Sequence, residues 1–134
     1  MSAENVTLIK GIYAAFGSGD VPAVIEAMSP GIVWNEAENF PYADGNPYVG
    51  ADAILGGVFA RIASEWDGFD VKPEQFLDAG DAVIMIGRYA GTWRGTGRAM
   101  NPQVAHIWTI SGGKVTGYQQ LVDTLAVARA MGTT

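Results

Sequence analysis

The chain has 134 residues, the size of one ordinary domain, and 49% of them are hydrophobic while 16% are charged. These proportions predict a chain that folds around a core and exclude a disordered one. The formal net charge is −6, and the eight Lys and Arg residues are scattered, which excludes the clustered positive charge that nucleic-acid binding requires. Because there is no cysteine, disulfide and thiolate chemistry are excluded as well.

The first residues and the apolar segments of the sequence indicate where in the cell we expect the protein. The first residues lack the basic region and long apolar run of a secretory signal. No uncharged stretch reaches the ~20 apolar residues of a membrane span. We therefore expect one domain over residues 1–134, in a cytoplasmic protein without a membrane or nucleic-acid partner.

The N-terminal part predicts two helices and a strand. Asp20 is a good N-cap for the second helix, which is expected to end at Pro30-Gly31. Residues 32–36 then read as a strand with Trp34 and Glu36 on the same side. The first helix is predicted from apolar residues spaced three and four apart: Val6, Ile9, Ile12, Tyr13 and Phe16.

A long loop and a third helix follow. The loop, about residues 37–50, is rich in Pro, Asn, Gly and aromatic residues, and loops of this length are often binding loops or lids. Apolar residues from Ile54 to Trp66 predict the third helix. Gly56 and Gly57 inside it each cost about 1 kcal/mol relative to Ala, so we expect close packing against another element there.

From Gly68 onward the apolar residues alternate, which predicts β-structure. The connections are too short for crossovers, so the strands must pair antiparallel, and Gly87 and Gly91 within one strand indicate strong curvature. A final helix is expected over 123–131 with Gly132 as its C-cap. The fold class is therefore α+β, with these strands: Phe69–Asp78, Ala82–Trp93, Ala99–Ile110 and Val115–Val122.

Six short motifs in this order resemble the NTF2-like superfamily, and within it the SnoaL-like polyketide cyclases and the related ketosteroid isomerases. The resemblance implies a cone in which a curved, mostly antiparallel sheet wraps around helices and encloses an apolar pocket. The motifs are 13–20 (YAAFGSGD), 32–34 (IVW), 50–54 (GADAI), 80–83 (GDAV), 112–115 (GGKV) and 122–125 (VDTL).

Glu36 is the first candidate catalytic residue. Its place on the first strand is similar to that of the isomerase's general base, and a carboxyl beside Trp34 would be partly desolvated, which raises its pKa toward values useful for proton transfer. The alternative is that Glu36 begins a polar loop together with Glu38 and faces water.

Tyr13 and His106 are two further candidates. Tyr13 lies at a position similar to the isomerase's oxyanion-hole tyrosine, although it also fits as a core aromatic residue. The isomerase's second donor, an aspartic acid, corresponds to Ala105 here, a departure from the family pattern. His106 alternates with apolar neighbours that predict an inward face, whereas the isomerase register would place Ala105 inward, so both registers stay open.

Asp123 is the fourth candidate. It matches an aspartate that SnoaL-like cyclases are thought to use as acid or base. It also directly precedes a predicted helix, so an N-cap role is the alternative.

The predicted function is cofactor-independent acid/base chemistry, such as isomerisation, cyclisation or hydration, on a small apolar molecule. The alternatives are a non-catalytic binding module and an accessory subunit with the same fold; polar groups converging in the pocket would favour an enzyme. A homodimer is expected because a curved sheet with an apolar outer face needs covering. With one histidine, a His-rich metal site is excluded. The expected substrate-binding residues are Trp34, Phe16, Phe59, Tyr89, Tyr118 and Gln120.

Overall fold

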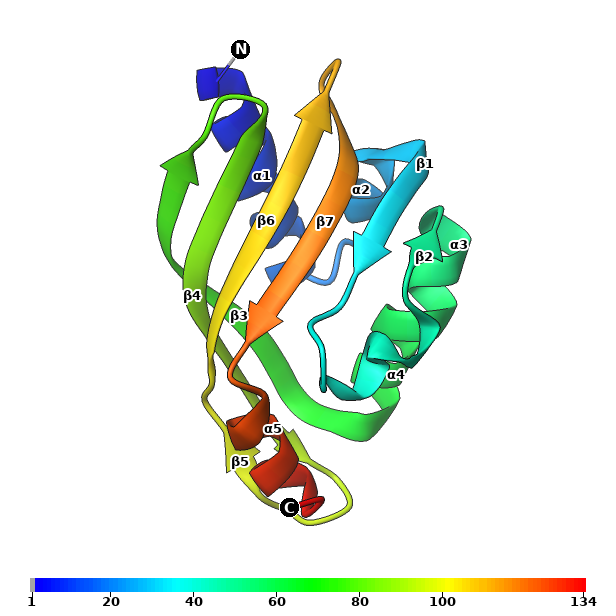
Figure 1. The fold of residues 1–134 in the computed structure, drawn as a ribbon, viewed down its shortest axis with the longest axis vertical. Coiled ribbons are helices and arrows are strands. Elements are labelled where there is room, and N and C mark those ends of the chain that lie inside the picture. The colour runs from blue at the N-terminus through cyan, green and yellow to red at the C-terminus, as the bar shows by residue number, and fades with distance from the viewer. Residues whose placement is uncertain (1) are drawn as a thin grey trace.

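A computed structural model describes residues 2–134 and confirms the mixed α+β class, with a curved, unclosed sheet and helices against one face (Figure 1). The helical segments are α1 (Ser2–Gly17), α2 (Val21–Glu26), the 3-10 segment η1 (Pro41–Gly45), α3 (Ala51–Ile54), the π-helical η2 (Leu55–Phe59), α4 (Ala60–Glu65) and α5 (Thr124–Met131). The strands are β1 (Met28–Asn35), β2 (Tyr48–Val49), β3 (Trp66–Asp78), β4 (Ala82–Trp93), β5 (Ala99–Met100), β6 (Gln103–Ser111) and β7 (Lys114–Val122).

The strands follow the order β2-β1-β7-β6-β4-β3, and β5 pairs with β4. Every pair is antiparallel except β1 with β7, which run parallel. This is the mostly antiparallel sheet that the short connections predict. In this parallel pair the first strand, β1, lies beside the last strand, β7.

The sheet bends where the two long paired strands β3 and β4 approach each other closely. The β3–β4 register shifts between Pro73 and Gln75, next to Gly87 of β4. A Cβ built on Gly87 would lie 2.2 Å from the Lys72 carbonyl oxygen, so only glycine allows the strands to approach this closely.

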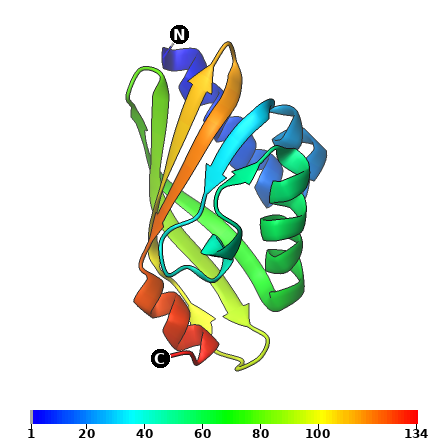
Figure 2. The ribbon, with the colours of Figure 1, turned by 45° about the vertical axis from the view of Figure 1, so that its right-hand side comes forward.

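The helices cover the concave face of the sheet. α1 runs along it behind β4 and β6, and the continuous helix α3–η2–α4 closes its open side (Figures 1 and 2). Two groups of buried side chains fill the interior, one around Trp34 and Trp108 and the other around Trp66 and Tyr89. The space between these groups is where the cavity lies.

Two element boundaries in the N-terminal half differ from the prediction. The second helix ends at Glu26, and β1 already begins at Met28 and continues through Pro30 and Gly31. The pairing of β1 with β7 is irregular between Met28 and Val33. Pro30, which has no N–H for the ladder, therefore lies where regular pairing is interrupted, so it does not end the element.

Further differences lie around Trp66 and Pro102, and the loop predicted over 37–50 contains η1 and β2. Trp66 begins β3 and does not end the third helix; its ring packs against Trp93, its partner across the β3–β4 ladder, at a centroid distance of 4.9 Å. The strand predicted over 99–110 is divided into β5 and β6. Pro102 lies between the two parts, and it cannot donate to the ladder.

The close approach expected at the paired glycines is found at one of them. A Cβ on Gly57 would lie 2.1 Å from the Tyr48 ring, whereas a Cβ on Gly56 would meet nothing within 4 Å. Because Gly57 has no side chain, the Tyr48 ring can pack directly against the helix. This contact fixes β2 against the segment that lines the cavity.

The predicted caps are confirmed. The carboxylate of Asp20 accepts a hydrogen bond from the Ala23 N–H, and Gly132 ends α5 in the left-handed conformation at φ 74°. None of the helices formed by residues 2–134 combines the length and apolar character that a membrane crossing needs.

Candidate functional site

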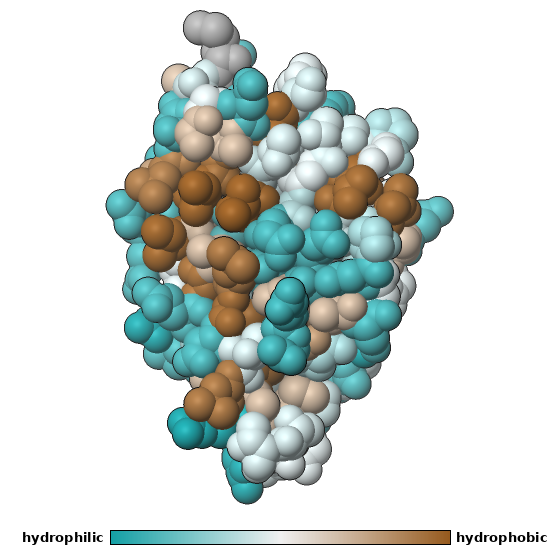
Figure 3. Space-filling model, in the orientation of Figure 1, coloured by the Kyte–Doolittle hydropathy of each residue, from teal (hydrophilic) through white to brown (hydrophobic). Residues whose placement is uncertain are grey.

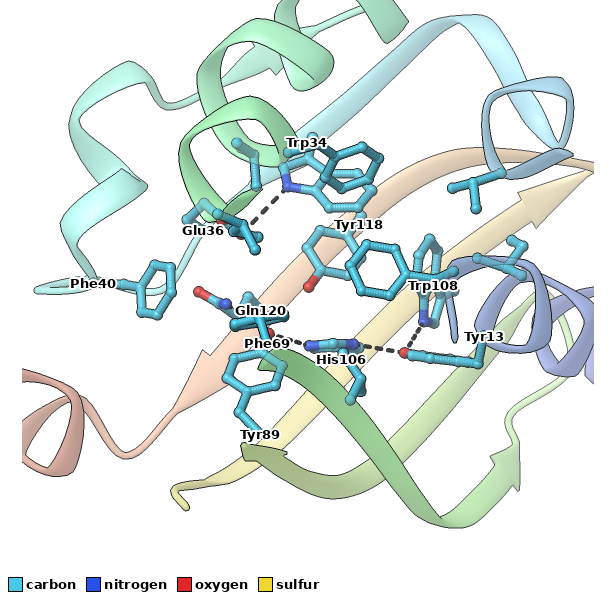
Figure 4. Close-up of a pocket in the computed structure, with 17 residues that line it drawn as sticks. Tyr13, Trp34, Glu36, Phe40, Phe69, Tyr89, His106, Trp108, Tyr118 and Gln120 are labelled. Carbon is cyan, nitrogen blue, oxygen red and sulfur yellow. Dashed lines mark hydrogen bonds between the residues drawn. The ribbon is translucent and has the colours of Figure 1, made fainter. Parts of the chain in front are cut away.

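A cavity of about 50 Å³ lies between α1, the helix η2–α4 and the concave face of the sheet (Figure 4). Its wall is mostly aromatic and aliphatic and also includes the polar side chains of Glu36, His106 and Gln120. The lining residues are Ile12, Tyr13, Phe16, Val24, Trp34, Glu36, Phe40, Val58, Phe59, Ile62, Phe69, Val71, Tyr89, His106, Trp108, Tyr118 and Gln120. A cavity of ~150 Å³ holds benzene, so a ring-sized ligand requires some of these side chains to move.

The alternation of β6 decides which side chain faces the cavity. His106 is 4% exposed and lines it, next to Trp108 two residues further on. Ala105 is on the opposite face, paired across the ladders with Ile86 and Leu121. The register that places His106 inward is therefore the one that the structure adopts.

Glu36 directly follows β1 and is 3% exposed. Its Oε2 accepts a hydrogen bond of 3.3 Å from the Trp34 indole N–H. Burial raises the pKa of Glu36 to about 7, an effect that the Trp34 hydrogen bond and the charge of Arg61 reduce only in part. A carboxyl in this state can both accept and return a proton near neutral pH.

The backbone around Glu36 is held by the side chain of Asn46. The Glu36 N–H donates to Asn46 Oδ1 at 2.9 Å, and Asn46 Nδ2 donates to the Glu36 carbonyl at 2.8 Å. The indole of Trp34 stacks on the Tyr118 ring at a centroid distance of 3.7 Å. These contacts fix the direction in which the carboxyl points.

His106 lies at the centre of a hydrogen-bonded network. Its Nδ1 is 2.6 Å from the Tyr13 hydroxyl, and its Nε2 is 2.6 Å from the Tyr89 hydroxyl (Figure 4). Trp108 Nε1 donates to the Tyr13 oxygen at 2.8 Å, and Gln120 Nε2 donates to the Tyr89 oxygen at 2.8 Å. Burial lowers the pKa of His106 to about 3, so the ring is neutral at physiological pH.

The phenols around the cavity are neutral as well. Burial raises the pKa of Tyr13, Tyr89 and Tyr118 well above the ordinary value of 10. The negative charge of Glu36 raises the pKa of Tyr89 and Tyr118 further. Figure 4 shows Glu36, Tyr118 and Gln120 directed toward the same space.

The structure brings together nine of the ten residues predicted from the sequence. Asp123 is the exception: it is exposed, lies outside the cavity lining, and caps α5 by accepting a hydrogen bond from the Ala126 N–H at 3.3 Å. The nine that line the cavity are Glu36, His106, Tyr13, Trp34, Phe16, Phe59, Tyr89, Tyr118 and Gln120.

Several residues of the site were not predicted. Trp108 shares the alternation of His106 along β6, and this period of two could have identified it. Asn46 belongs to the irregular loop, where no period shows which side chain turns inward. Phe69 is on β3, upstream of the bend.

The groups that meet in the cavity are one carboxyl, three phenols, one neutral imidazole and one amide. Residues 2–134 contain no group of three or more His, Cys, Asp or Glu placed to hold a metal ion. The chemistry that these side chains themselves supply is proton transfer and hydrogen-bond donation.

Comparison with solved structures identifies the class of the fold as NTF2-like. An NTF2-like protein from Burkholderia thailandensis E264 is 41% identical, with a TM-score of 0.91 over 95% of this chain and 96% of that one. TerC, co-crystallised with polyporic acid, is 25% identical, with a TM-score of 0.86 over 96% and 98%. A putative SnoaL-like polyketide cyclase from Jannaschia sp. CCS1 is 19% identical, with a TM-score of 0.84 over 99% and 94%, which shows the fold alone.

The model of the SnoaL-like domain matches residues 9–118. The chain therefore belongs to the SnoaL-like family, as its motifs predict. A search of curated proteins gave no match.

Proposed function

We propose that this protein is a small-molecule enzyme in which Glu36 transfers a proton to and from a carbon atom of a ligand bound in the cavity. The observation that carries the proposal is a nearly fully buried carboxyl, with a pKa raised to about 7, beside neutral hydroxyl donors. Within residues 2–134, the Lys and Arg side chains that form ion pairs do so with Asp44 and Asp67, and none pairs with Glu36. An ion pair would lower its pKa and make it a weaker base.

The proposed reaction begins with a ligand whose carbonyl group faces the hydroxyls. The Glu36 carboxylate removes a proton from the carbon next to the carbonyl, and the C–H electron pair becomes part of an enolate. A tyrosine hydroxyl donates a hydrogen bond to the enolate oxygen, where the negative charge collects. Glu36 then returns the proton to the same or a conjugated carbon, so exchange or isomerisation results without a net change in atoms.

The walls of the cavity favour a small, flat, apolar ligand. Phe16 and Phe59 pack edge to face, and the Trp34–Tyr118 stack forms a flat surface. TerC, which has the same fold, is seen with polyporic acid. Cyclic enones and phenolic ring systems are therefore the ligand class that we propose.

The proposal predicts deuterium exchange catalysed by the protein. Cyclohex-2-enone and larger cyclic ketones, incubated in D₂O and followed by proton NMR, should lose their acidic C–H signals faster with the protein than in buffer alone. The rate should rise with pH through about 7, because only the ionised Glu36 removes a proton. Saturable ligand binding without any exchange would instead favour the binding module, the alternative function.

We also propose that the protein forms a homodimer through the outer face of its sheet. Apolar side chains on β3, β4, β6 and β7 adjoin one another across the ladders, and Figure 3 shows such side chains gathered over this face. Leu77 is 38% exposed and Leu121 50% exposed. The residues of this outer patch are Leu77, Ile84, Ile86, Ala105, Ile107 and Leu121.

Native mass spectrometry of the unmodified protein should report a dimer, and Ile107→Lys should convert it to a monomer by placing a charge in the centre of the outer patch. Val49→Lys is the matched control, since Val49 is 59% exposed on the edge strand β2 and lies outside the patch. A monomeric unmodified protein, or an Ile107→Lys variant that stays dimeric, would contradict the proposal.

A further inference from the structure

Three side chains, His106, Trp108 and Gln120, form hydrogen bonds with the hydroxyls of Tyr13 and Tyr89, and the hydrogen-bonding capacity of each group is limited. Tyr13 and Tyr89 can each donate one hydrogen bond, while the indole N–H of Trp108 can only donate. Gln120 is fixed in orientation, because its Oε1 accepts from the Ala37 N–H at 3.0 Å and its amide nitrogen therefore faces Tyr89. The proton on the imidazole decides how the remaining bonds are directed.

A neutral imidazole has one N–H donor and one acceptor nitrogen, and both nitrogens of His106 are engaged at 2.6 Å. If Nδ1 carries the proton, it donates to Tyr13, and Tyr89 donates to Nε2. If Nε2 carries the proton, it donates to Tyr89, and Tyr13 donates to Nδ1. In each arrangement one of the two tyrosines keeps a free O–H.

The surroundings of the two hydroxyls distinguish these arrangements. Within residues 2–134, the Tyr13 hydroxyl has two hydrogen-bond partners, His106 and the donor Trp108. With a proton on Nδ1, the Tyr13 O–H would be left among aromatic rings without an acceptor, which is costly for a buried group. Tyr13 and Tyr89 both line the cavity, but the Tyr89 hydroxyl also lies next to the Tyr118 hydroxyl, whose oxygen can accept its hydrogen bond.

We propose that His106 carries its proton on Nε2 and thereby makes Tyr89, rather than Tyr13, the hydroxyl that donates to an oxygen of a bound ligand. Tyr89 accepts two hydrogen bonds, from His106 and Gln120, and two accepted bonds polarise its own O–H toward donation. Tyr13 and His106 are then positioning residues. The ligand is a planar molecule with a carbonyl or phenolate oxygen, so this inference rests on the proposed function for its ligand class.

The position of the proton can be measured directly, because His106 is the only histidine in the chain. Protein labelled with ¹⁵N-histidine gives one imidazole in long-range ¹H–¹⁵N NMR spectra. We expect the Nε2 resonance to be that of a protonated nitrogen and the Nδ1 resonance that of an unprotonated acceptor. The reverse pattern, or an averaged pair, would overturn the proposal.

The donor can be identified with pentafluorophenolate as a probe and hexafluorobenzene as its control, which replaces the oxygen by fluorine. Binding of both is followed by ¹⁹F NMR at about pH 6, where Glu36 is mainly neutral. Tyr89→Phe should weaken pentafluorophenolate binding about 10- to 100-fold, the value of a hydrogen bond to a charged group, and leave hexafluorobenzene binding unchanged. Tyr13→Phe removes the bond to His106 Nδ1 but no bond to the ligand, so it should weaken pentafluorophenolate binding less than Tyr89→Phe does.

An equal or larger loss in Tyr13→Phe would overturn the proposal, as would no pentafluorophenolate binding by the unmodified protein. The hexafluorobenzene measurement shows whether each variant keeps its cavity. Neither experiment requires turnover, so a protein that binds without catalysing exchange can still pass both. Exchange that depends on Glu36 in a protein with the proton on Nδ1 would remove this inference and leave the proposed function standing.

Discussion

Replacing Glu36 by glutamine should lower the exchange of a ligand's C–H hydrogens for deuterium about 100- to 10,000-fold, the usual contribution of a general base. The amide keeps the size of the side chain, and its oxygen can still accept the bond that Trp34 donates. It cannot accept a proton. The loss should therefore lie in the rate at saturating ligand, with ligand binding little changed.

Asp123→Asn is the matched control for this experiment. Asparagine caps helices as well as aspartate does, so the variant keeps the bond to the Ala126 N–H while removing a carboxyl outside the cavity. We expect its exchange rate to equal that of the unmodified protein. If Asp123→Asn lost activity and Glu36→Gln kept it, the assignment of Glu36 as the general base would be wrong.

The second large effect is a dependence of the free energy of unfolding on pH. Glu36 determines how this free energy changes as the pH rises. Burial raises the pKa of Glu36 from 4.5 to about 7, so the folded state holds this proton more tightly than the unfolded state. The contribution of Glu36 to the free energy of unfolding is fully present below pH 4.5 and is lost as pH rises through about 7. The corresponding free energy is about 3 kcal/mol.

His106 has the opposite effect: it lowers the free energy of unfolding as the pH falls. Its pKa falls from 6.5 to about 3 on folding, so the unfolded state binds this proton more tightly. The contribution is present above pH 6.5 and is lost as pH falls through about 3, with a size of about 5 kcal/mol. Between about pH 4.5 and 6.5 the two contributions offset each other.

Urea unfolding at a series of pH values measures both effects. Because the two contributions offset each other between about pH 4.5 and 6.5, Glu36→Gln should make the free energy of unfolding rise with pH in this range, and His106→Gln should make it fall. Subtracting each variant's free energy of unfolding from that of the unmodified protein removes the contributions of the other carboxyl groups. Parallel curves for the unmodified protein and Glu36→Gln would show that Glu36 titrates normally and is not buried in solution.

The family motifs and the alternation of apolar residues determined the fold class, because both report local preferences that the tertiary structure keeps. The same is true of the caps at Asp20 and Gly132. Strand boundaries near Pro30 and Pro102 were predicted less well. A proline removes one ladder bond wherever it occurs, but whether the strand ends there depends on how its neighbours pair.

The sequence by itself also identified polar candidates for the site, since Glu36 and Tyr13 occupy positions similar to catalytic residues of the isomerase and His106 alternates with apolar neighbours. It left open whether His106 or Ala105 faces inward and whether Asp123 is a catalyst or a cap. The tertiary structure alone shows that His106 faces the cavity, because a shift of one residue in the pairing of β6 would exchange its two faces. It also shows that Asp123 caps α5 and lies outside the cavity lining. The hydrogen bonds from Trp108 through Tyr13 and His106 to Tyr89 join α1, β4 and β6. Bonds between segments this distant in the chain form only when the helix packs against the sheet.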